Sequence, residues 1–82
     1  MTQREKLLGK ALKEPGSLHF NELVLLAEHF DFVLVRSKGS HHIFKRKDYP
    51  NLLNFQNFKG KAKAYQVNQL LEALRELGLI EE

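Results

Sequence analysis

The chain has 82 residues, which is enough for one domain with a modest core and excludes a two-domain enzyme. It contains no cysteine, which excludes a disulfide framework and a thiolate metal site and is compatible with a reducing cytoplasm. No unbroken apolar segment follows the N-terminus, so we expect neither a signal peptide nor a membrane span, and a soluble, cytoplasmic protein.

The formal net charge is only +3, but the basic residues are concentrated in the middle of the chain. Between positions 36 and 63 a single acidic residue, Asp48, opposes eight basic ones: Arg36, Lys38, Lys45, Arg46, Lys47, Lys59, Lys61 and Lys63. This segment therefore predicts a field suited to a polyanion. A solvated basic face that only keeps the protein soluble is the alternative. The coincidence with a Gly-Ser-His-His turn favours a functional face.

Two helices are predicted first. In residues 2–14 the apolar positions fall on one helical face, and Pro15-Gly16 ends the helix. A second helix is predicted over residues 21–30, with Asn21 as its cap. His19 and His29 lie in this region ten residues apart, which is not the spacing of a metal pair on a helix. We therefore expect no metal site there.

Three strands are predicted next, over residues 32–36, 41–47 and 52–56, as an antiparallel meander. A basic connection made flexible by Gly60 leads to a last helix over residues 65–77, which Gly78 stops. The order predicts an α+β fold, in which a three-stranded antiparallel sheet carries helices on one face and leaves the other open.

The first two strands predict a hairpin with residues 37–40 as its loop. Because side chains alternate along a strand, His42 shares a face with Phe44, which marks the core side. His41 then stands on the open face beside Lys45, unless a bulge next to the turn exchanges the two histidines. Gly39 supplies a positive φ, and the small Ser40 leaves the backbone accessible to a phosphate.

The run Gly39-Ser40-His41-His42-Ile43-Phe44 resembles the HicA toxins, small bacterial ribonucleases of type II toxin–antitoxin systems. The similarity covers roughly residues 20–79 and includes the third strand and the closing helix. It implies a fold like that of double-stranded-RNA-binding domains, cleavage of mRNA without a metal or other cofactor, and inactivation by a HicB antitoxin. Residues 1–16 are then an N-terminal helical extension of a HicA-like domain over residues 17–82; the extension either folds onto the core or serves a partner.

A histidine can take a proton from a ribose 2′-hydroxyl or give one to the departing 5′-oxygen. We therefore expect His41 to be the catalytic residue, with His42 as the second choice. The expected RNA-binding residues are Lys38, Gly39, Ser40, Lys45, Arg46, Lys47, Lys59, Lys61 and Lys63. Tyr49 and Tyr65 could stack on bases, but rim or packing roles are favoured. A non-catalytic RNA-binding module is the alternative function.

Overall fold

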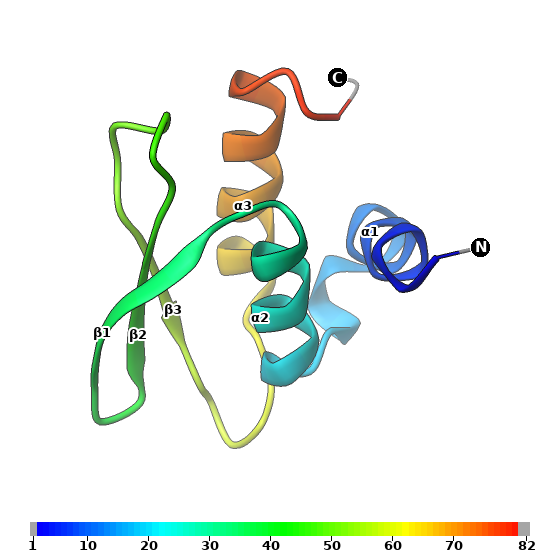
Figure 1. Ribbon diagram of the computed structural model, residues 1–82. Coiled ribbons are helices and arrows are strands. Elements are labelled where there is room, and N and C mark those ends of the chain that lie inside the picture. The colour runs from blue at the N-terminus through cyan, green and yellow to red at the C-terminus, as the bar shows by residue number, and fades with distance from the viewer. Residues whose placement is uncertain (1, 81–82) are drawn as a thin grey trace.

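The computed structural model describes residues 2–80 and has an α+β architecture. Its elements in chain order are α1 (Gln3–Lys13), a short 3₁₀ helix η1 (Pro15–Ser17), α2 (Phe20–His29), β1 (Val33–Lys38), β2 (His41–Lys45), β3 (Leu53–Gln56) and α3 (Ala64–Glu76). The strands form an antiparallel sheet in the order β1-β2-β3. Two helices, α2 and α3, lie on one side of this sheet, and α1 lies beyond them (Figure 1). The α+β class is confirmed, and so is the predicted fold like that of double-stranded-RNA-binding domains.

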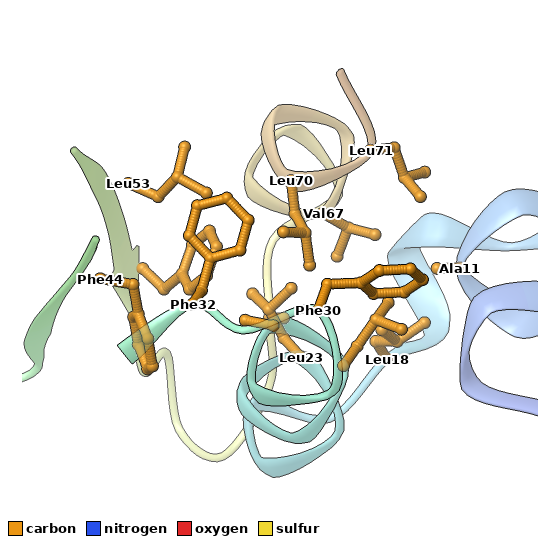
Figure 2. Packing of buried hydrophobic residues seen from close by; sticks show 14 of the residues in the cluster. Ala11, Leu18, Leu23, Phe30, Phe32, Phe44, Leu53, Val67, Leu70 and Leu71 are labelled. Carbon is orange, nitrogen blue, oxygen red and sulfur yellow. The ribbon is translucent and has the colours of Figure 1, made fainter. Parts of the chain in front are cut away.

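The main core fills the space between the sheet and the helices α2 and α3. Phe44 and Leu53 enter it from the strands, and Leu23 and Leu70 enter it from the helices (Figure 2). Each is at most 6% exposed. The alternation of Leu53 and Phe55 with polar residues explains why one face of β3 is buried and the other is not.

Helix α1 folds onto the same core. Leu7 and Ala11 are buried in the core cluster, while Lys10 forms an ion pair with Glu22 of α2 at 3.0 Å. No helix within residues 2–80 is long and apolar enough to span a bilayer. The amphipathic stripe predicted for residues 2–14 therefore packs against the protein's own helices.

Two helix starts differ from the predictions. Helix α2 begins at Phe20 with His19 as its cap, so the assignment of Asn21 as the cap is wrong. The reason is that the Glu22 carboxylate accepts a hydrogen bond from the His19 backbone N–H at 2.9 Å, which stabilises a start one residue earlier. Helix α3 likewise begins at Ala64, and Gly78 follows its end with φ +71°, as predicted.

The first hairpin is tighter than predicted. Strand β1 continues to Lys38, which pairs with His41, so the turn contains only Gly39 and Ser40. Gly39 has φ +59°, and this left-handed conformation at the first turn position lets the strands pair up to the turn. A bulge is present, but it lies in β1 between Leu34 and Arg36. It therefore leaves the alternation of His41 and His42 along β2 intact.

The outer edge of β3 is closed by a side chain. Gln66 of α3 is 3% exposed; its Oε1 accepts from the Gln56 backbone N–H at 3.0 Å, and its Nε2 donates to the Asn54 carbonyl at 3.3 Å. These two bonds replace part of the ladder that a fourth strand would make. Gln66 thus fixes α3 beside the edge of the sheet.

Candidate functional site

The open face of the sheet carries a polar row next to the first turn. His41 pairs with Lys38 on one neighbouring strand and with Gln56 on the other. Directly paired residues project on the same side of a sheet. The imidazole of His41 therefore stands between a lysine and an amide side chain, on the face that the helices leave uncovered.

The His41 ring is exposed and is oriented by a hydrogen bond. Its Nδ1 lies 3.3 Å from Oδ1 of Asn54 on β3. Because a carbonyl oxygen only accepts, Nδ1 carries the proton and donates. Nε2, on the other side of the ring, keeps its lone pair in the neutral form. This arrangement can take a proton from a group that approaches the open face.

His42 has a different environment, on the side predicted from its parity with Phe44. It is half-buried, its Nδ1 donates to the Ser40 carbonyl at 3.1 Å, and its ring lies 4.8 Å from the Phe20 ring, centroid to centroid. These contacts join the turn to the start of α2. His42 supports the position of the turn, while His41 faces solvent.

A basic hollow lies beside His41 on the β1 side. It has a volume of about 640 Å³, and its lining residues are Arg36, Lys38, Gly39, Ser40, His41 and Ile43. Two cations, a serine hydroxyl and the backbone of a glycine turn therefore surround one open space. Such a set of groups suits a phosphate.

The basic connection reaches the same end of the sheet, as the adjacent lower turns in Figure 1 show. The Asn57 backbone N–H donates to the Ser40 carbonyl at 2.8 Å, and the Phe20 N–H donates to the Gly60 carbonyl at 2.9 Å. Hydrogen bonds therefore attach the connection around Gly60 to the first turn and to the start of α2; its predicted flexibility stays a prediction. Its lysines, Lys59, Lys61 and Lys63, share this end with Lys38, Gly39 and Ser40.

The structure does not bring the other predicted RNA-binding residues to His41. Lys45 lies on the open face, but four residues along β2, or roughly 13 Å away at about 3.3 Å per residue. Arg46 and Lys47 lie beyond it at the opposite end of the sheet. The Arg46 side chain is only 14% exposed and forms ion pairs with Asp48 at 2.7 Å and Asp31 at 3.8 Å. Its charge is engaged within the fold.

A second hollow adjoins His41 on the β3 side and was not predicted. It has a volume of about 460 Å³ between β3 and α3, and its lining residues are His41, Tyr49, Leu52, Leu53, Asn54, Gln56, Tyr65, Gln66, Gln69 and Glu72. The available sequence signals were the polar face of β3 and the i, i+4 spacing of Tyr65 and Gln69. His41 lines both hollows.

The comparisons with known proteins identify the family. Residues 20–79 match the family model described as the HicA toxin of bacterial toxin–antitoxin systems. The chain belongs to the HicA toxin family. Searches of curated proteins and of solved structures returned no match. The HicA match begins at the first residue of α2 and contains the whole row around His41, whereas α1 lies outside it.

Other ionisable groups of this HicA-family chain have structural roles. The Tyr49 hydroxyl donates to the Glu76 carboxylate at 2.7 Å, which together with burial raises the Tyr49 pKa. Tyr49 therefore stays protonated, and its ring packs edge-on against Phe32. His19 and His29 are exposed, and in residues 2–80 no three His, Asp or Glu side chains gather as metal ligands would.

Proposed function

We propose that this member of the HicA toxin family is an mRNA endoribonuclease in which His41 acts as general base and acid without a metal ion. The observation that carries the proposal is the exposed His41 ring, which Asn54 orients beside a basic hollow. Cleavage of mRNA would place its action in the cytoplasm. The two cations of the basic hollow, Arg36 and Lys38, and the open sheet face support RNA as the substrate over a small uncharged molecule.

In the proposed reaction the ribose 2′-oxygen forms a bond to the adjacent phosphorus, and its proton passes to Nε2 of His41. The bond from phosphorus to the 5′-oxygen breaks, and this oxygen takes a proton from the imidazolium or from water. The products are a 2′,3′-cyclic phosphate and a 5′-hydroxyl. Lys38, as the cross-strand neighbour of His41, would stabilise the negative charge on phosphorus oxygens.

The size of these effects suits a slow nuclease. A positioned general acid or base contributes about 10²- to 10⁴-fold in rate. No second exposed histidine accompanies His41 among the residues that line the two hollows. One histidine therefore has to serve both proton transfers, or water has to complete the second.

An antitoxin of the HicB type is the proposed protein partner. Strand β1 is an outer strand that begins with three exposed apolar side chains: Val33 is 61%, Leu34 47% and Val35 54% exposed. An antitoxin that covers both this apolar strand and the basic hollow would block RNA access. Such a complex would persist at high salt, whereas phosphate contacts alone would weaken.

The experiment is incubation of the purified protein with a long single-stranded RNA in EDTA, followed by gel electrophoresis and analysis of product ends. We expect cleavage with 2′,3′-cyclic phosphate ends. A second RNA with one 2′-deoxynucleotide at a mapped cleavage position should stay intact at that position only.

Two results would contradict the proposal. RNA that stays intact but shifts in mobility would indicate the alternative, a non-catalytic RNA-binding module of the same fold. Cleavage that EDTA abolishes, or that continues at the 2′-deoxy position, would exclude metal-independent attack by the 2′-hydroxyl.

A further inference from the structure

The hollow between β3 and α3 has a chemical character opposite to that of the basic hollow. Its lining residues within the described chain include no lysine or arginine, and its one charged side chain is the acidic Glu72. A phosphate is disfavoured there because like charges repel. Besides the shared His41, the other polar groups are neutral amides and tyrosine hydroxyls, and the amides suit an uncharged ligand with hydrogen-bonding edges.

We propose that this hollow binds one unpaired RNA base adjacent to the phosphate that reacts at His41. The inference rests on the proposed function and deepens it, since it defines the substrate as single-stranded RNA. A base in a duplex keeps its pairing edge covered and is stacked on both faces, so only an unpaired base can enter a lateral hollow. The volume of about 460 Å³ is within the range of small-molecule pockets.

Tyr65 provides the stacking surface. It lies in the first turn of α3 and is 54% exposed, so its ring is not used by the core. An exposed aromatic ring beside a nucleic-acid path is the usual platform for an unpaired base. A packing role would not leave the Tyr65 ring this exposed, whereas a rim position that stacks on a base would.

The amide groups of the hollow can contact the base edge. Gln69 lies one helical turn after Tyr65 and is exposed, and Gln56 faces the hollow from β3. An amide side chain carries both a donor and an acceptor, as the edges of bases do. The amide of Gln66 is already bonded to the β3 backbone. It therefore forms the floor and sets the separation of α3 from the strand.

The shared residue connects the two hollows. His41 contributes to the lining of both, so a phosphate in the basic hollow and a base in the β3–α3 hollow would lie on either side of the imidazole. This is the arrangement that one nucleotide and its neighbouring phosphate require. The base would then hold the 2′-hydroxyl near Nε2.

The test measures RNA binding, so that it does not depend on cleavage. All variants carry His41→Ala to keep the RNA intact. A short single-stranded RNA is used together with a set in which each position in turn is abasic. The proteins are the His41→Ala parent and this parent with Tyr65→Ala, Tyr65→Phe or Leu12→Ala; Leu12 is an exposed leucine of α1, outside both hollows.

In the parent, an abasic site at one position should weaken binding about 5- to 150-fold, the range of base–aromatic stacking. Tyr65→Ala should weaken binding of the intact RNA by a similar factor and remove the sensitivity to that abasic site. Tyr65→Phe and Leu12→Ala should behave like the parent. The inference is overturned if no position is sensitive, or if the abasic penalty is unchanged in Tyr65→Ala. Absence of cleavage by the wild-type protein, in contrast, would overturn the proposed function only.

Discussion

At the residue scale, we expect substitution of glycine by alanine to have opposite effects on stability at two positions. Gly39 has φ +59°, whereas Gly9 lies inside α1, and a Cβ at either position would meet no atom within 4 Å. We expect Gly39→Ala to lower the free energy of unfolding by about 1 to 2 kcal/mol because of the left-handed backbone. Gly9→Ala should raise it by about 1 kcal/mol. Urea unfolding of both variants measures the change in the free energy of unfolding. A change of the same sign in the two variants would contradict the prediction.

Lys59 is a second residue whose backbone conformation is informative. It has φ +52°, a region unfavourable for a residue with a side chain. We expect Lys59→Gly to raise stability by roughly 0.5 to 1 kcal/mol, since the strain outweighs the extra freedom of glycine in the unfolded chain.

Lys59→Gly should also weaken RNA binding. The slope of the logarithm of the RNA-binding constant against the logarithm of the salt concentration should fall in magnitude by about 1, the effect of one lost phosphate contact. Lys6→Ala on α1, outside both hollows, is the matched control and should leave the salt dependence unchanged. Stability and RNA affinity that change in the same direction in Lys59→Gly would argue against a phosphate contact.

At the element scale, Gln66 joins α3 to the edge of β3. Gln66→Leu removes the partner of the Gln56 N–H and of the Asn54 carbonyl, and we expect a loss of about 1 to 3 kcal/mol. Asn68→Leu, at an exposed position of the same helix, should have little effect. Hydrogen exchange at the Gln56 amide is the second readout, because it should accelerate only in Gln66→Leu.

The junction of α1 and α2 predicts a dependence of stability on pH. The His19 backbone N–H, assisted by Lys10, lowers the Glu22 pKa from its ordinary 4.5. A lowered pKa means that the ionised carboxylate stabilises the fold fully above pH 4.5, and that this contribution is lost as the pH falls through the folded-state pKa.

Glu22→Gln should therefore cost about 1 kcal/mol near neutral pH and less near pH 3. Glu28→Gln, at an exposed position of α2, is the control and should not lose stability near neutral pH. Urea midpoints at both pH values test this, and a cost that is the same at both would contradict the assignment.

Periodic patterns explain what could be predicted of these elements. The parity of His42 with Phe44 along β2 predicted which histidine faces the core, and the leucine spacing predicted the buried face of α3. The hollow beside Tyr65 was missed because it depends on the contact of Gln66 with β3, ten and twelve residues away. Arg46 was expected to bind RNA because it belongs to the basic segment; its ion pair with Asp31 is formed only when the chain folds and could not be predicted.

At the scale of the whole molecule, the layers separate support from function. Helix α1 lies behind α2 and α3 (Figure 1), whereas the basic hollow lies on the uncovered face of the sheet and the second hollow lies at the β3 edge, next to α3. The family match covers residues 20–79 and so includes this face but not α1. We propose that α1 stabilises the fold through Leu7 and Ala11 and has no direct contact with RNA.

The central claim is that the exposed His41, and not the neighbouring His42, performs the proton transfer. The most direct measurement compares RNA cleavage in EDTA by wild type, His41→Ala and His42→Ala, with an unfolding curve for each variant. We predict that His41→Ala keeps wild-type stability and loses at least about 100-fold in cleavage rate. His42→Ala should be less stable but should still cleave RNA under conditions where it is folded. Undiminished cleavage by His41→Ala would contradict the account.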